Sequence, residues 1–395
     1  MLDLLMVLPG ERAGSELATA VALAEASAAI ARLDQALASH PLRQAFLYRA
    51  RLEAVRRQAG VDGALIDPWQ LAATLEGLRL RMDPFLRIID RGLILDAART
   101  ALTLHQWLVE PDFDQEGEVQ RAEAVLAAQP ATLPPLLAAT QGVRVWIESG
   151  DGRAPIRAAL VRFWTRRHLL RAPVPLTGAA ALRADQSWEL TAWVPAFLRA
   201  LEREAADGLD LLYTMERAWF ESRRAVGPRR KTSCAGAAVD VLAAAPVISA
   251  TSLARILGIA VKNAIRLLDE LCGAEVAIEV THRSKRRLFG LAGLAPLREV
   301  VRPPYRPDPN RGPGWPQHEI IEDDVGTALL PLQVLPPLSP IERRAFDYSA
   351  LEAAMAHLDA VVVRTRQALG RLTLNGHRPA SPSPDGAVQG DAACP

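Results

Sequence analysis

The sequence has few cysteines and no long apolar run, and each shortage excludes a class of protein. Its three cysteines, Cys234, Cys272 and Cys394, lie far apart in 395 residues. That spacing argues against a disulfide framework and suits a reducing cytosol. No apolar stretch approaches the ~20 residues that a membrane span needs, and the start of the chain lacks the basic region of a signal peptide. We therefore expect a cytoplasmic protein that does not partner with a membrane.

The chain also has no overall excess of one charge, because its formal net charge is only +1. Residues 221–290, however, hold twelve Lys and Arg against six Asp and Glu, a net of +6, and the remainder carries a net of −5. All three lysines, Lys231, Lys262 and Lys285, fall in this window. Positive charge concentrated on one module is the footprint expected of phosphate binding. Any nucleic-acid surface is therefore expected to be local.

Helical spacing of apolar residues predicts a mainly α fold, and the length of the chain predicts more than one domain. Helices are expected over residues 16–39, 41–58, 67–78, 83–108, 153–172 and 186–225. The acidic stretch EPDFDQEGE at 110–118 is expected to break this pattern, and the Pro-rich stretch at 130–136 to connect helices.

Five segments follow from this pattern. They are a multi-helix domain over 1–225, a winged helix-turn-helix domain over 232–295, a Pro-rich linker over 296–345, one helix over 346–372 and a disordered tail over 373–395.

The winged helix-turn-helix prediction rests on the stretch SATSLARILGIAVKNAIRLLDEL, which begins at Ser249. Two short helices that cross steeply need a small residue at their contact and a tight turn, and Ala254 and Gly258 supply these. Ser249 can cap the first helix, whereas Ala260 stands where a capping Ser or Thr usually begins the second. Apolar residues expected to lock the helix pair are Leu253, Leu257, Ile259, Ala264 and Leu267.

Candidate DNA contacts lie on the second helix and on the hairpin expected after it. Lys262, Asn263 and Arg266 are residue types that bond base edges or phosphates in the major groove. Val276, Ile278 and Val280 alternate as in a strand, and a basic turn then leads to a second strand through Phe289. The remaining candidate contacts are Ser252 in the first helix and Arg283, Lys285, Arg286 and Arg287 in the wing.

A second motif is Gly150-Asp151-Gly152-Arg153, directly before a predicted helix. With the helical domain ahead of it and the winged helix after it, this stretch resembles the Gly-Asn-Gly-Arg loop of the Fic/DOC nucleotidyl transferases. The resemblance covers most of residues 15–291 and implies a loop whose amides hold nucleotide phosphates at a helix N-terminus. It also places residues 53–63 where that family has an inhibitory helix-end motif. Read from the residues alone, the motif is a turn that enters a helix.

The same resemblance implies that the active site is degenerate. Val145 stands at the position of the catalytic histidine, Ile147 at that of an aromatic residue, Ser149 at the acidic metal-binding position and Asp151 at that of the loop asparagine. Valine cannot accept a proton from a hydroxyl nucleophile. The seven histidines show no metal-ligand spacing either. We therefore expect no enzymatic activity, no cofactor and no metal.

The layout is also similar to plasmid-encoded proteins of plant-associated, rhizobial-type bacteria, which pair a domain of unknown function with a C-terminal helix-turn-helix. This resemblance implies a regulator. The leading hypothesis is a sequence-specific regulator that binds double-stranded DNA, with homodimer formation left open. Two alternatives are residual nucleotidyl transfer and an antitoxin-like module that binds a protein partner.

Overall fold

Helices dominate the described part of the chain, so the expectation of a mainly α fold is confirmed. The computed structural model describes residues 9–64, 66, 68–76, 88–227, 233–281, 287–295, 357 and 360–361. Residues 1–342 and 343–395 form separate compact units, and the architecture below is that of the first. The expected linker at 296–345, the expected tail at 373–395 and nearly all of the helix expected at 346–372 lie outside the described residues.

Two groups of elements follow one another along the chain. The first is α1 (Pro9–Leu37), α2 (Arg43–Val61), α3 (Pro68–Leu75), α4 (Ile88–Val109), α5 (Phe113–Ala127), α6 (Pro135–Glu148), α7 (Arg153–Arg166), the 3-10 helix η1 (Ala179–Leu182) and α8 (Leu190–Val226). The second is α9 (Ala235–Ala244), β1 (Ile248–Ser249), α10 (Ala250–Leu257), α11 (Val261–Gly273), β2 (Ala277–Glu279) and β3 (Leu288–Leu291).

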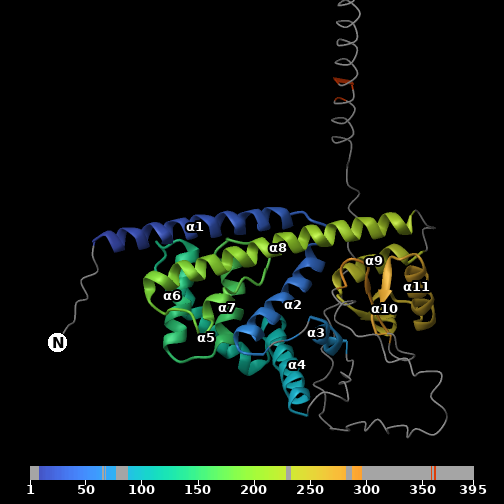
Figure 1. Cartoon of the computed structure of the whole chain (residues 1–395), viewed down its shortest axis with the longest axis horizontal. Helices are drawn as coiled ribbons and strands as arrows, with labels where there is room; N and C mark the ends of the chain where they lie inside the picture. The colour runs from blue at the N-terminus through green and yellow to red at the C-terminus, as the bar shows by residue number, and fades with distance from the viewer. Residues whose placement is uncertain are drawn as a thin grey trace, which may run out of the picture. The chain divides into compact units, whose positions relative to one another are not determined.

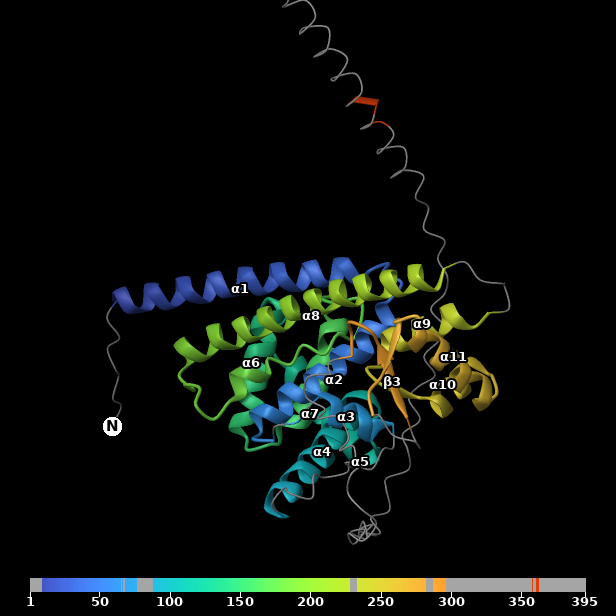
Figure 2. The same ribbon diagram turned by 45° about the vertical axis from the view of Figure 1, so that its right-hand side comes forward.

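The long helices α1 and α8 lie side by side and run parallel, with the other helices of the first group packed beneath them (Figures 1 and 2). Contacts near both ends of α1 and α8 show that the two helices run in the same direction. Ser15 Oγ lies 3.5 Å from the carbonyl of Thr191 near the two N-termini. His40, just past the end of α1, lies 3.4 Å from Glu216 near the end of α8.

The prediction that residues 110–118 break the helical pattern is wrong for residues 113–118, which form the start of α5. Asp112 caps this helix: its carboxylate accepts the amide of Gln115 at 2.9 Å, and the Gln115 side chain accepts the amide of Asp112 at 3.1 Å. Such a capping box satisfies two amides that the first helical turn leaves without partners. The acidic residues that suggested a break instead favour a helix N-terminus.

The helix expected over 153–172 is also too long, because α7 ends at Arg166. His168 follows with a φ of 55°, in the left-handed region that terminates helices. The chain then runs as an extended loop to η1. There the buried carboxylate of Glu204 on α8 accepts three backbone amides, those of Thr177, Gly178 and Ala179, at 2.6 to 3.1 Å.

The second group combines three helices with a small antiparallel sheet. The strand order is β1-β3-β2, with Ile248 opposite Phe289 and Ile278 opposite Gly290. The two helices of the expected turn motif are present as α10 and α11, and α9 precedes them. The strands expected around Ile278 and Phe289 are present as β2 and β3. The two-residue strand β1 has no counterpart among the sequence predictions.

This second group packs firmly against the first, because one continuous core includes residues of both. Arg49 on α2 is buried, and its guanidinium donates to the carbonyls of Ala243 at 2.7 Å and of Leu242, Ala245 and Leu294 at 3.3 Å. The last carbonyls of a helix have no partner within it, so Arg49 caps the C-terminus of α9. Burial lowers the pKa of Arg49 to about 10, which leaves it charged at neutral pH.

Two further contacts join the groups. Asp240 on α9 accepts hydrogen bonds from Trp219 Nε1 and Arg223 Nε on α8, both at 2.8 Å. On the opposite side, Ala72 and Ala73 of α3 pack into a small apolar cluster with Val247, Val280 and Leu288. Helices α2, α3 and α8 therefore fix the position of α9, β1 and β3.

Candidate nucleic-acid interface

The turn between α10 and α11 is built as its sequence predicts. Ser249 is the N-cap of α10, and its Oγ accepts the amide of Ser252 at 3.1 Å. Gly258 ends α10 with a φ of 65°, a conformation that side chains other than glycine adopt at a cost. Ala260 precedes α11 in an extended conformation and gives no side-chain cap.

Apolar residues lock the two helices together, although they are only partly those expected. Leu253, Ala254 and Ala264 are fully or almost fully buried. Leu257, Ile259 and Leu267 are only half-buried and pack at the edge of the core. Leu268 and Leu271 are the other fully buried residues of α11, and with Ala264 they follow the i, i+4, i+7 spacing of a helix face.

The opposite face of α11 is exposed and carries the predicted base-contact residues. Lys262, Asn263 and Arg266 all point away from the core. Lys262 forms no ion pair with any carboxylate of the described residues. Arg266 Nε lies 3.9 Å from Glu270 Oε1 one turn further on, and such an exposed pair is weak.

Two aliphatic side chains on the same helix are also exposed, Val261 at 43% and Ile265 at 42%. Sequence reasoning did not select them, although they neighbour Lys262 and Arg266. It also missed Arg255, which is exposed on the last turn of α10 and forms no ion pair with a described carboxylate. Its place in the first helix of the predicted helix-turn-helix was the available signal, since in that motif the first helix crosses the DNA backbone.

Ser252 is already bonded within the protein. Its Oγ donates to Glu76 Oε2 at 2.8 Å, and the backbone amide of Ser249 donates to the same oxygen at 3.1 Å. Glu76 directly follows α3. A carboxylate therefore occupies the N-terminus of α10, where unpaired amides and the helix dipole favour an anion.

Arg287 is likewise engaged. It is paired with Asp269 on α11 and lies 3.3 Å from Glu279 on β2, with its guanidinium 4.8 Å from the centre of the Phe289 ring. The hydrogen bond to Asp269 raises the pKa of Arg287. Arg287 therefore ties β3 to α11 and β2. The other predicted wing residues, Arg283, Lys285 and Arg286, lie outside the described residues.

The Gly150–Arg153 stretch forms the turn between α6 and α7. Gly150 has a φ of 82°, Gly152 is the N-cap of α7, and the Gly152 carbonyl accepts the indole N–H of Trp146 at 2.7 Å. Asp151 lies 3.7 Å from Arg121.

Two arginines at the start of α7 converge on Asp62 at the C-terminal end of α2. Arg153 and the buried Arg157 donate to its carboxylate at 2.8 and 2.7 Å. Burial alone would raise the pKa of Asp62, but the hydrogen bonds from Arg157 and Arg153 hold it below its ordinary value. This ion-pair cluster joins α2 to the loop that resembles the Fic/DOC motif.

Three of the four positions that the resemblance assigns to the active site lie on or next to α6. Val145 is 47% exposed, Ile147 packs against the core, and Ser149 Oγ donates to the carbonyl of Val145 at 2.8 Å. Among the described residues, no three His, Cys, Asp or Glu side chains are arranged to hold a metal ion.

No protein-family model matches the sequence, and no curated protein matches it significantly. Within the part of the chain that the structure describes, no helix combines the length and the apolar character needed to cross a membrane.

Proposed function

We propose that residues 235–291 form a winged helix-turn-helix and that the protein is a sequence-specific DNA-binding regulator of transcription or plasmid function. The order α9, β1, α10, α11, β2, β3 and the antiparallel order β1-β3-β2 support this class. The tight turn at Gly258 and the buried face of α11 meet the steric needs of such a helix pair.

The observation that carries the proposal is the exposed face of α11. Its first two turns present Lys262, Asn263 and Arg266 to solvent, and these residues have the donor groups that read guanine and adenine edges in the major groove. Val261 and Ile265 on the same turns could contact thymine methyl groups. An exposed helix with this composition fits the groove, because recognition helices contact bases through their N-terminal residues.

The distribution of charge also supports α11 as the helix that faces DNA. The acidic residues of α11 fall in its second half, and Asp269 is neutralised by Arg287. Arg255 on α10 adds a positive charge on the helix that would cross the phosphate backbone. In this arrangement Arg266 and Asn263 determine which sequence is bound, whereas Arg255 and the basic wing determine how tightly any DNA is held.

The contacts of the Gly150–Arg153 loop support a role in holding the fold rather than in nucleotide transfer. Arg153 is paired with Asp62, and Asp151 brings a negative charge to the turn where phosphates would bind. Val145 has no group that can accept a proton. We therefore propose that the helical domain has no catalytic activity and serves as the support on which the DNA-binding surface is mounted.

The test is selection of bound fragments from a random DNA pool by the purified full chain. The proposal expects enrichment of one sequence motif and an affinity that falls steeply as salt rises, since phosphate contacts release counterions. Retention of no fragment at any salt concentration, or binding that is tight and independent of salt, would show that the proposal is wrong.

A further inference from the structure

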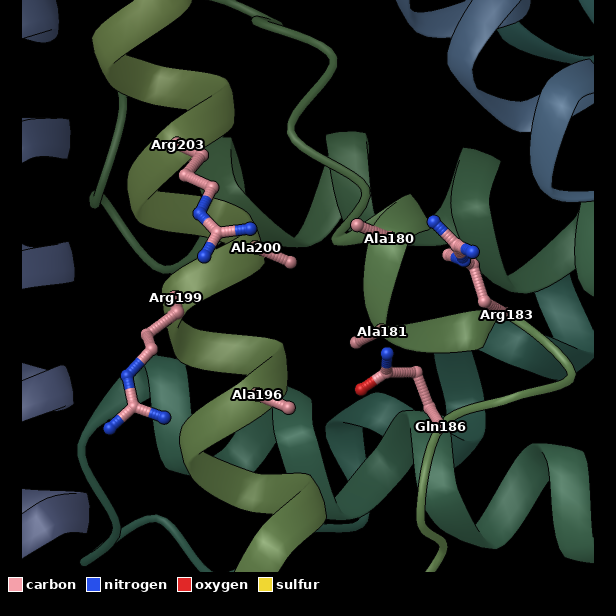
Figure 3. Close-up of a pocket in the computed structure, with 8 residues that line it drawn as sticks. All are labelled: Ala180, Ala181, Arg183, Gln186, Ala196, Arg199, Ala200 and Arg203. Carbon is pink, nitrogen blue, oxygen red and sulfur yellow. The ribbon is translucent and has the colours of Figure 1, made fainter.

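A shallow hollow lies between η1 and the N-terminal half of α8. None of its lining residues belongs to α11. It has a volume of about 270 Å³ and is lined by Ala180, Ala181, Arg183, Gln186, Ala196, Arg199, Ala200 and Arg203. Figure 3 shows Arg199 and Arg203 one turn apart on α8, with Arg183 and Gln186 on the other side of the alanines; the Arg203 guanidinium lies toward the alanines, whereas the Arg199 side chain extends away from them. Small side chains create the space, and three arginines lie at its edge.

The charges around this hollow are only partly compensated. Arg183 is paired with Asp185, with both of its contacts at 3.0 Å. Arg199 and Arg203 are exposed and form no ion pair with a carboxylate of the described residues. Like charges at i and i+4 on a helix repel each other, so an anion bound beside Arg203 would reduce its repulsion with Arg199 and would also be attracted by Arg183.

The two walls are held rigidly, which lowers the cost of ordering them around a ligand. Glu204, next to Arg203 in sequence, accepts the amides of residues 177–179 and so binds α8 to the start of η1. Trp193 Nε1 donates to the carbonyl of Ala181 at 3.2 Å. Gly178 allows the close approach, since a Cβ there would lie 2.4 Å from the Phe197 ring.

We propose that this hollow is a binding site for a small phosphorylated molecule. Guanidinium groups match phosphate oxygens in pairs, and Gln186 can donate from its amide. The volume lies just below the roughly 300–1,000 Å³ of pockets for drug-sized ligands, so the ligand is of the size of a sugar phosphate or pyrophosphate. Ligand binding at this site does not depend on DNA binding. If the protein is the proposed regulator, the ligand would be its effector.

The test titrates the full chain with inorganic pyrophosphate by calorimetry at low salt. We expect a Kd of about 1 mM or tighter. Replacing both Arg199 and Arg203 with Gln should weaken binding by roughly tenfold or more. The matched control replaces Arg217 and Arg224 with Gln, because these are exposed arginines of the same helix outside the hollow. Asp185→Asn, which frees Arg183, should tighten binding.

Three results would overturn the proposal. They are no binding of pyrophosphate by the wild type, equal weakening in the control pair, and a loss of DNA affinity in the Arg199/Arg203 variant that the control pair does not share. The last would make the arginines a nucleic-acid contact. Melting temperatures of all variants should stay near that of the wild type, since every substituted side chain is exposed.

Discussion

The carboxylate of Glu76 lies 2.8 Å from Ser252 Oγ and 3.1 Å from the amide of Ser249, so it occupies the N-terminus of α10. The two ends of this contact are 176 residues apart in the chain. In the proposed function, α10 is the helix that crosses the DNA backbone. Glu76 then occupies the place where a phosphate would bind. The segment at the end of α3 that carries Glu76 must therefore move away before Ser252 can contact DNA.

Replacing Glu76 with Gln is therefore expected to tighten DNA binding while it lowers stability. The variant removes the negative charge from the helix N-terminus, and a hydrogen bond to a charged group contributes about 1.5–3 kcal/mol. We expect affinity for random-sequence DNA to rise by roughly threefold or more, as measured by fluorescence anisotropy. Glu110→Gln is the control, because it removes the same charge from an exposed position. If both variants bind DNA more tightly to the same extent, the effect is due to net charge alone and not to the position of Glu76.

Arg49→Met is expected to loosen the attachment of α9 to α2. Methionine replaces the aliphatic stem of the arginine but leaves the carbonyls of Leu242, Ala243, Ala245 and Leu294 without their shared donor. Each buried polar group without a partner costs about 1–3 kcal/mol, so the free energy of unfolding should fall by about 3 kcal/mol or more. Urea denaturation gives this value. Arg32→Met removes one exposed local hydrogen bond and should change the free energy of unfolding little. If Arg49→Met lowers that free energy no more than Arg32→Met does, the capping role of Arg49 is contradicted.

His105 should make the protein less stable as the pH falls. This residue is buried, neither of its ring nitrogens has a hydrogen-bond partner among the described residues, and its ring meets Tyr48 edge-on at 6.4 Å. Burial, aided by the charge of Arg51, lowers the pKa of His105 to about 4. Between pH 6.5 and pH 4 the unfolded chain therefore binds more protons than the folded one, and stability declines as pH falls through this window.

The size of that decline is about 3 kcal/mol, since one pKa unit corresponds to ~1.4 kcal/mol. His105→Phe should remove the decline that His105 causes, as measured by urea denaturation at several pH values. His168→Asn is the control, because His168 is exposed and its positive φ suits asparagine. An unchanged pH dependence in His105→Phe would show that the ring is not the group responsible.

Much of the local structure could be predicted from sequence. The cap at Ser249, the turn at Gly258 and the exposed face of α11 follow from residue types at short spacing, and such signals need no knowledge of the fold. The start of α5 was missed because an acidic cluster reads as a loop unless Asp112 and Gln115 are recognised as a reciprocal cap. Strand β1 was missed because two residues are too few to show alternation.

Contacts between distant segments could not be predicted. Nothing near Ser252 in sequence indicates that Glu76 binds it, and nothing near Arg49 indicates that it caps α9. Arg287 looked like a free phosphate ligand because its partners lie on α11 and β2, and Arg199, Arg203 and Arg183 come together only once α8 packs on η1. Sequence therefore predicted which residues belong to the candidate surface, whereas the fold decides which of them are free.

The most direct measurement compares the affinity of Arg266→Ala for a selected DNA site with its affinity for random DNA. If α11 reads bases, the ratio of the two affinities should fall by roughly tenfold, since one good side chain–base pair contributes about 1–3 kcal/mol of discrimination. Arg255→Ala should weaken both affinities alike and reduce the salt slope by about 1. A ratio in Arg266→Ala equal to that of the wild type would contradict sequence reading by this face of α11.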